Sequence, residues 1–437
     1  MTVNIFTWCL FWDKKMKALL ISLLIPLILG SDQSCSLHQN QDQQTRCKRP
    51  DGYELIAQAN SEFGFKLYKE LTALGPRSWA QNILYSPISI FTIFSLLSQG
   101  AASGSATYQQ IVDVLSLNRA DNDQQINEGI QSILEKISKS TNVTKTSIGN
   151  AIFLGERIRL LDSFHVIMDK YYKADFERTM FHVPQIAEEQ INKYVRKNTD
   201  GKITNLVSNL DPNTFMVLVN YILFKGEWKD TFNKEATHEE EFTLINHSKI
   251  KVPMMHRQGL YKTFSDKDLD CKVIEIPYKD KVSMIVAVPR LDIHRVGQAL
   301  TFTSFEKWLD SLASSFVEIS LPKFSINEKL PDFPKNLQHL GMNDVFSEKA
   351  DLTRISPYPK LQVTKAFHQA VLEVNESGTE ASGATAIAIG ETSSLLPFFK
   401  VDRPFFVFIY DKKTKSILFM GRVTEPAPAN RKHHKSA

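Results

Sequence analysis

The segment from Thr379 to Ala388 places the strongest constraint on how this chain can fold. Its side chains are almost all small, and it contains no aromatic residue, no basic residue and no proline. Nothing in it prevents an extended conformation, and little would hold it in place. If it paired into a sheet, alternate residues would face one side, because side chains alternate with period two along a strand. The segment is therefore predicted to be a loop that is able to become a strand.

Two apolar runs follow this segment. They are FFKVDRPFFVFIY at 398–410 and SILFMGRV at 416–423, separated by the polar residues DKKTK. Aromatic and aliphatic runs of this length, joined by a short polar turn, are typical of buried strands in a hairpin. Taken alone, these residues also fit a disordered linker that precedes a C-terminal hairpin.

The loop and the strands after it resemble those of the serpins. GTEASGATA at 378–386 is similar to the serpin hinge, and VDRPFFVFI at 401–409 is similar to the sequence that follows the reactive loop. The likeness extends over about residues 55 to 426 and is greatest to the extracellular, antitrypsin-like group (clade A). It implies an α+β fold with a mixed central β-sheet that can accept the reactive loop as an extra strand, further sheets, and about eight or nine helices.

The resemblance also assigns positions to the family's working parts. The reactive-centre loop would span about residues 378–398, and its hinge would comprise Gly378, Thr379, Glu380, Ala381, Ser382, Gly383, Ala384 and Thr385. Glu376 would pair with Lys323, and Trp228 would lie in the breach at the top of the sheet. Ser86, Ser89, Asn220 and His368 would form a polar cluster, the shutter, behind the strands that must separate. An ordinary hydrogen-bonded core histidine is the alternative for His368.

The N-terminal 30 residues are predicted to be a secretory signal peptide. Basic residues at 14–17 precede the apolar run ALLISLLIPLIL and then Gly30 and Ser31, as in a signal sequence. A run this short, interrupted by proline, does not span a bilayer; the alternative is a buried N-terminal helix. We expect a secreted, extracellular protein with no membrane partner. A polar, Gln-rich tail at 31–52 is predicted to be disordered, 53–426 to form a single domain, and 427–437 to be a basic tail.

Charge and cysteine usage restrict the partners. The net charge of +4, from 52 basic and 48 acidic residues spread along the chain, argues against a dedicated nucleic-acid-binding protein. An oxidising compartment would permit Cys35 to pair with Cys47 and would leave Cys271 free. The cysteine spacing does not resemble a zinc site, so neither a metal nor a cofactor is expected. Sequons at Asn142 and Asn246 are the expected glycosylation sites, and a third at Asn375, just before the hinge, is expected to be silent.

None of the short enzyme motifs of hydrolases, metalloproteases or nucleotide-binding proteins occurs, so we do not expect an enzyme. The resemblance instead implies a monomeric serine protease inhibitor that forms a covalent acyl complex with its target. Counting from the hinge places the cleaved bond at Thr392–Ser393, whereas counting back from the following strand places it after Ser393. Because these side chains are small and no basic residue is near, an elastase-like protease is expected, or a chymotrypsin-like one that uses Leu395 or Leu396. The alternative is a non-inhibitory carrier of small apolar hormones, of the thyroid or corticosteroid kind.

Overall fold

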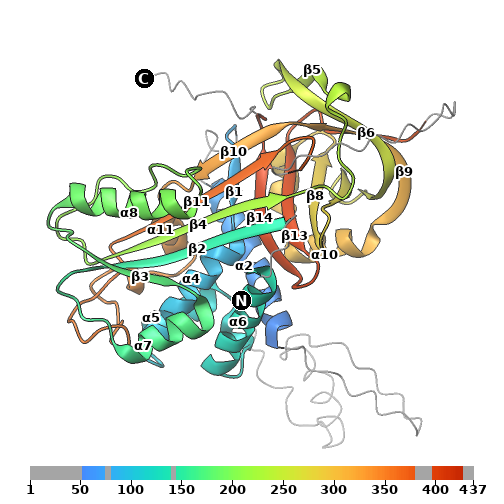
Figure 1. Cartoon of the computed structure of the whole chain (residues 1–437). Helices are drawn as coiled ribbons and strands as arrows, with labels where there is room; N and C mark the ends of the chain where they lie inside the picture. Colours follow the sequence, from blue (N-terminus) through green and yellow to red (C-terminus); the bar gives the residue numbers. More distant parts are fainter. Residues whose placement is uncertain (1–51, 74–79, 139–143, 379–395, 427–437) are drawn as a thin grey trace, which may run out of the picture. The chain divides into compact units, whose positions relative to one another are not determined.

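The computed structural model describes residues 52–73, 80–138, 144–378 and 396–426. Two β-sheets and nine α-helices make up this part of the chain (Figure 1). The helices are α2 (Gly52–Ala73), α4 (Pro87–Gly100), α5 (Ala106–Val114), α6 (Asp123–Ser138), α7 (Asp162–Ile167), α8 (Pro184–Asn198), α9 (Ile293–Ala299), α10 (Phe302–Ser311) and α11 (Phe333–His339). The predicted α+β class and the expected helix number are confirmed.

The smaller sheet has five strands in the order β10, β11, β4, β2, β3. Their bounds are β10 (Phe324–Lys329), β11 (Lys365–Val374), β4 (Met216–Gly226), β2 (Thr144–Gly155) and β3 (Asp175–Thr179). The two strands at its centre, β11 and β4, are parallel to each other, while β10 and β2 lie antiparallel to them on either side. The sheet is therefore mixed, and β11 and β4 are joined by a parallel ladder from Lys365↔Val217 to Leu372↔Phe224.

Helices cover both faces of this sheet (Figure 1). The side chains of β4 alternate between two separate apolar clusters, as a strand buried on both faces requires. Val217 and Val219 pack beneath α8, together with Ile191 and Val195 of that helix. Met216, Leu218 and Ile222 face the larger core on the other side, where α4 is buried along its whole length. α4 carries no charged residue, and the hydroxyls of Thr92 and Ser98 donate to carbonyl oxygens of the same helix, so it can be buried on all sides.

The second sheet has nine strands. Its main path runs β1 (Ile83–Tyr85), β14 (Ser416–Val423), β13 (Phe405–Asp411), β8 (Val282–Pro289), β7 (Cys271–Pro277), β6 (Lys249–Asp266), β9 (Ala313–Pro322) and β12 (Phe398–Lys400), and β5 (His238–Thr243) pairs with β6. The predicted hairpin is present as β13 and β14, both fully or largely buried. The first apolar run was expected to be one strand, however, and it forms two. It is broken before Pro404, so that β12 pairs with β9 while β13 pairs with β8.

Within the described ranges, no helix has the length and the apolar character needed to cross a membrane.

Candidate functional site

A row of polar side chains crosses the centre of the five-stranded sheet. Strand pairing places Asn150 of β2 opposite Asn220 of β4, and Asn220 opposite His368 of β11. Nδ2 of Asn220 donates a hydrogen bond to Oδ1 of Asn150, and Nδ1 of His368 donates one to Oδ1 of Asn220. All three residues are buried. The two central strands are thus joined by a side-chain hydrogen bond in addition to their backbone ladder.

The N-terminus of α4 completes this cluster. Ser86 caps the helix, and its Oγ accepts from the backbone N–H of Ser89 at 3.2 Å, with Pro87 in the first turn. The backbone N–H of Ser86 donates to Nε2 of His368 at 3.1 Å, and Nδ2 of Asn220 donates to the carbonyl oxygen of Ser89 at 3.0 Å. The four residues assigned to the shutter therefore lie together, with α4 attached to both strands.

The hydrogen bonds of His368 fix its protonation state. Because Nε2 accepts a hydrogen bond from a backbone N–H, the ring's own proton is on Nδ1 and the ring is neutral. Burial lowers the pKa of His368 to about 3. A neutral, fully hydrogen-bonded imidazole has no free lone pair to act as a base, so this histidine holds strands together instead.

At the upper end of β11 the chain is held by an ion pair. Nζ of Lys323 lies 3.0 Å from Oε2 of Glu376, and the hydroxyl of Thr237 donates to Oε1 of Glu376 at 3.0 Å. Glu376 is only 5 % exposed. Burial alone would raise the pKa of Glu376, but its backbone hydrogen bond and the ammonium group of Lys323 outweigh burial and hold this pKa below the usual value. The predicted partners are thus brought into contact.

Trp228 packs under the residues that precede the loop. Its indole ring stacks on the ring of Tyr278, with centroids 4.3 Å apart, and its Nε1–H donates to the carbonyl oxygen of Asn375 at 2.9 Å. The backbone N–H of Trp228 donates to the carbonyl oxygen of Ser377 at 3.1 Å. Two hydrogen bonds therefore connect this tryptophan, which is wholly buried, to the last turn before the loop, and the ring of Tyr278 supports its other side.

Gly378, the first residue of the assigned hinge, ends this turn. It has φ +118°, a backbone conformation that favours glycine. A Cβ at this position would lie 2.1 Å from the carbonyl oxygen of Gly226, so the approach of the two backbones also requires glycine. The turn is closed by reciprocal backbone hydrogen bonds of 3.1 Å between Asn375 and Gly378.

Several predicted residues lie outside the described part of the chain. They are the hinge residues Thr379, Glu380, Ala381, Ser382, Gly383, Ala384 and Thr385, the cleavage-site residues Thr392 and Ser393, the sequon residue Asn142, and Cys35 and Cys47. Asn246 is exposed in the turn between β5 and β6, where its Oδ1 accepts hydrogen bonds from Ser248 of the same sequon. Cys271 is a free, buried thiol, and burial raises its pKa to about 12.

Sequence reasoning missed three contributors to this site. Asn150, Thr237 and Tyr278 come from strands or turns that carry no motif of their own, and each matters only because of the residue it contacts. Asn150 had one usable signal, since it interrupts the apolar end of β2 with a buried amide. Its partner could not be identified before the register of β2 against β4 was known.

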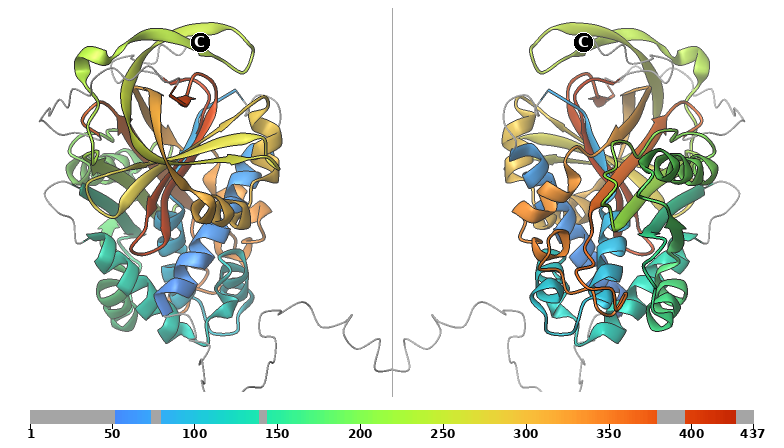
Figure 2. Two further views of the ribbon diagram at one scale, coloured as in Figure 1. Left: turned by 90° about the vertical axis from the view of Figure 1, so that its right-hand side faces the viewer. Right: turned by 90° about the vertical axis from the view of Figure 1, so that its left-hand side faces the viewer.

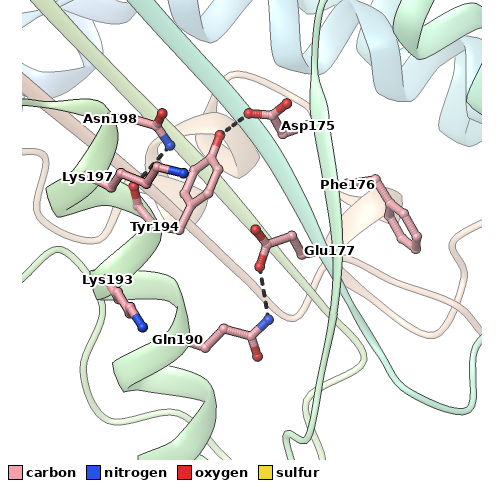
Figure 3. Close-up of a pocket in the computed structure, with 8 residues that line it drawn as sticks. All are labelled: Asp175, Phe176, Glu177, Gln190, Lys193, Tyr194, Lys197 and Asn198. Carbon is pink, nitrogen blue, oxygen red and sulfur yellow. Dashed lines mark hydrogen bonds between the residues drawn. The ribbon is translucent and has the colours of Figure 1, made fainter.

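A hollow of about 410 Å³ on the other face of the sheet does not belong to this site (Figure 3). It lies between α8 and β3, and charged side chains of both signs line it. Figure 3 shows the hydroxyl of Tyr194 donating to Asp175 and the amide of Gln190 donating to Glu177. Because small-molecule sites are mostly apolar, this polar hollow is poorly suited to an apolar hormone.

Comparisons with known proteins identify the family. Residues 58–426 match the family model described as "Serpin (serine protease inhibitor)". The chain is 39 % identical to "Serine protease inhibitor A6" of Xenopus laevis, over 90 % of each chain, and 35 % identical to the human "Plasma serine protease inhibitor", over 92 % of this chain and 99 % of the relative. Among solved structures, human thyroxine-binding globulin complexed with thyroxine superposes with a TM-score of 0.80 at 31 % identity, covering 86 % of this chain and all of that one. This chain belongs to the serpin family, and within it to the antitrypsin-like clade A.

Proposed function

We propose that this chain is a secreted serine protease inhibitor that acts as a suicide substrate. The observation that carries the proposal is the parallel pairing of β11 and β4 at the centre of the sheet, with the chain running from the end of β11 into the small-residue segment. If the segment after Gly378 turned back and entered between β11 and β4, it would run antiparallel to both strands. It would replace one parallel ladder by two antiparallel ones, which are slightly more stable per residue.

The net gain from such insertion is one additional ladder. If about eight new hydrogen bonds each contribute about 0.5–1.5 kcal/mol, the cleaved form gains roughly 4–12 kcal/mol before side-chain burial is counted. The entering residues must fit between the helix-covered faces of the sheet without burying an unpaired charge. The alternate residues Thr379, Ala381, Gly383 and Thr385 are small and uncharged, which satisfies this condition.

Three contacts on the described part of the chain oppose insertion before cleavage. They are the His368–Asn220 hydrogen bond across the two central strands, the Glu376–Lys323 ion pair, and the hydrogen bond from Trp228 to Asn375. Each joins β11, or the residues just after it, to a neighbouring element. An uncut loop is also tethered at its far end, where β12 pairs with β9. The native form can therefore be held short of its lowest free energy.

Cleavage releases that tether while the protease is still attached. The protease's serine attacks the carbonyl carbon of the scissile bond, at Thr392–Ser393 or one residue later, and the amine of the C-terminal part leaves with a proton. The new ester bond joins the protease to the N-terminal part of the loop, which then enters the sheet. Hydrolysis of the ester requires closely held geometry, so the pull on the serine slows it.

The test is incubation of the purified protein with elastase-like, chymotrypsin-like and trypsin-like serine proteases. We expect a complex that survives a denaturing gel with one of the first two classes, and a released C-terminal fragment whose mass identifies the cut bond. A matched control is Thr385→Arg, which leaves the cleavage site intact but places a charge in the entering strand. Inhibition by trapping would be ruled out if the unmodified protein were simply cleaved, at the same rate as Thr385→Arg and with no covalent complex.

A carrier of small apolar hormones is the second candidate. It is favoured by the similarity to thyroxine-binding globulin and by a hollow of about 360 Å³ beside β12, a volume within the range of small-molecule sites. The aromatic rings of Phe398 and Phe399 line this hollow, which suits a flat apolar ligand. Its charged residues Arg290 and Arg403 are paired with Asp270 and Asp402 of the same lining. Titration of thyroxine and corticosteroids against tryptophan fluorescence tests this function, and Phe399→Ala should weaken binding if the hollow is the site.

We further propose that the protein is exported and glycosylated. The signal-like N-terminus and the exposed Asn246 support this proposal, as does the similarity to a plasma inhibitor. Expression in a eukaryotic secretory system should yield a chain that lacks residues 1–30 and shifts in mass on enzymatic deglycosylation. Retention of the N-terminal residues, or no shift, would contradict it.

A further inference from the structure

Two histidines and a glutamate converge on the hairpin formed by β5 and β6. Nε2 of His238 lies 3.0 Å from Oε1 of Glu240, and Nε2 of His256 lies 2.7 Å from the same oxygen. The three ligand atoms are all within 4.8 Å of one another. The hairpin is the yellow-green arch that Figure 2 shows above the other strands.

Strand pairing explains why these side chains meet. His238 and Glu240 are two residues apart on β5 and therefore share a face. His238 is opposite Met254 on β6, so His256, two residues further along, lies diagonally across on that same face. The two imidazole rings are stacked, with centroids 4.5 Å apart and planes 5° from parallel. Both rings thus present Nε2 to one carboxylate oxygen.

The hydrogen bonds of these rings leave a place for a cation. Nδ1 of His238 is 3.2 Å from the carbonyl oxygen of Ala236, which can only accept, so in the neutral ring the proton is on Nδ1 and Nε2 carries a lone pair. Nε2 of His256 is buried and makes no hydrogen bond despite its short distance to Glu240. When Nε2 of His256 also carries a lone pair, two nitrogen lone pairs and a carboxylate oxygen face one another, and they repel unless a cation lies between them.

Neighbouring residues orient the carboxylate and add a further donor. Nζ of Lys400 on β12 is 2.7 Å from Oε2 of Glu240, which leaves Oε1 directed at the histidines. Ser320 of β9 pairs with both His256 and Lys400, so it lies between them on the same face. Its hydroxyl is buried and has no hydrogen-bond partner among the described residues. A metal-bound water is the kind of group that such a hydroxyl could bind.

From these contacts we propose that His238, Glu240 and His256 form a binding site for a divalent transition metal, zinc being the best match. Two imidazole nitrogens and one carboxylate oxygen are a common zinc donor set with three protein ligands and one open position. Tetrahedral zinc with bonds of about 2.0–2.2 Å places its ligands about 3.4 Å apart. The distances from Glu240 are 3.0 Å to His238 and 2.7 Å to His256, shorter than that spacing by roughly 0.4 and 0.7 Å. His238 is exposed and Glu240 has a long side chain, so small rotations of both would open the site to that spacing. No metal was expected from the cysteine spacing. The site proposed here uses histidine and glutamate ligands and no cysteine.

The site would cross-link β5, which pairs only with β6 in the described part of the chain, to the body of the sheet. Through Glu240 and Lys400 it would also contact β12, the strand that follows the reactive loop. Binding of zinc to the folded form alone raises its stability by mass action. This inference does not depend on whether the protein inhibits proteases or carries a ligand.

The test is calorimetric titration of the full, chelator-treated chain with zinc chloride, together with metal analysis of the dialysed complex. We expect one zinc per chain in this site, lost in the double variant His238→Ala/His256→Ala and weakened at least tenfold in Glu240→Gln. Two controls should bind like the parent: His165→Ala, which removes an exposed histidine paired with Asp169 outside the proposed site, and the tail variant His433→Ala/His434→Ala. Binding that disappears in the tail variant and persists in the double variant would overturn the proposal, as would a parent that binds no zinc.

A second measurement covers the case in which the double variant fails to fold. Cobalt(II) added to the unmodified protein should give the visible absorption of a tetrahedral nitrogen and oxygen site, and paramagnetic broadening should be strongest for the ring protons of His238 and His256. Broadening confined to other histidines would exclude this site.

Discussion

Replacement of Glu376 should loosen the top of the five-stranded sheet. Its carboxylate accepts from Lys323 at 3.0 Å and from Thr237 at 3.0 Å, in a position that is 5 % exposed. Glu376→Gln keeps the shape and one hydrogen bond but removes the charge. Glu376→Lys places a second ammonium group beside Lys323.

The size of each effect follows from the exposure of the two partners. Loss of one partner from a fully buried pair costs about 3–5 kcal/mol. The side chain of Lys323 is 40 % exposed, so it regains water when Glu376 is replaced, and mainly the charge-assisted hydrogen bonds are lost. We therefore expect Glu376→Gln to lower the free energy of unfolding by about 1–3 kcal/mol, and Glu376→Lys to lower it by about 3–5 kcal/mol.

The assay is urea unfolding followed by tryptophan fluorescence, with native gels to detect polymers. Glu348→Gln is the matched control, because Glu348 pairs with Lys360 at 3.3 Å but both side chains are largely exposed. We expect the control to match the parent, and Glu376→Lys to form polymers on warming. Equal midpoints for the Glu348 and Glu376 variants would refute the assignment of this ion pair as a structural clamp.

The same pair predicts a dependence on pH. The pKa of Glu376 is lower in the folded chain than in the unfolded chain. Its stabilising contribution is therefore complete above the unfolded pKa, about 4.3, and is lost as the pH falls through the folded value. The difference in unfolding midpoint between the parent and Glu376→Gln should shrink as the pH is lowered below that range, and a difference that grew on acidification would contradict the sign.

Three further changes test other parts of the site. Asn220→Ala should destabilise the protein by about 2–4 kcal/mol in urea unfolding, because it leaves His368 and the start of α4 without buried hydrogen-bond partners; a loss below 1 kcal/mol would contradict the role given to this cluster. Gly378→Ala should disrupt the turn before the loop, because the new Cβ would meet the backbone of Gly226. The amide of Trp228, which donates to Ser377 in this turn, should then exchange faster, and an unchanged exchange rate would contradict the prediction. Cys271 should resist alkylation in the native protein at pH 8, because burial raises its pKa to about 12. Mass spectrometry should show full labelling of this thiol in urea, and rapid labelling in the native protein would be inconsistent with its burial.

The sequence predicted the residues of this site better than their mutual arrangement. Ser86 and Trp228 were assigned from the resemblance to the serpins, and Ser86 also has a local signal, because it precedes Pro87 at the start of a helix. Asn150 and Thr237 were not found, because their roles come from strand register and from a turn that lies far away in sequence. The division of residues 398–410 into β12 and β13, before Pro404, was also missed, because it depends on which strands the two halves pair with.

That break, and the histidine cluster, show what local pattern cannot supply. Hydrophobicity does not distinguish one long strand from two strands in different parts of the same sheet. His256 likewise has no sequence neighbour that signals a metal site, and it meets His238 and Glu240 only after β5 folds onto β6. Tertiary pairing, which acts on residues remote in sequence, decides both.

The melting temperature before and after cleavage near Thr392 tests the central claim most directly. If the small-residue segment enters between β4 and β11, the additional ladder of roughly 4–12 kcal/mol should raise the melting temperature by at least about 5–15 °C for a domain of this size. The Thr385→Arg variant, cut at the same bond, should show a smaller rise. A melting temperature that stays unchanged after complete cleavage would contradict insertion.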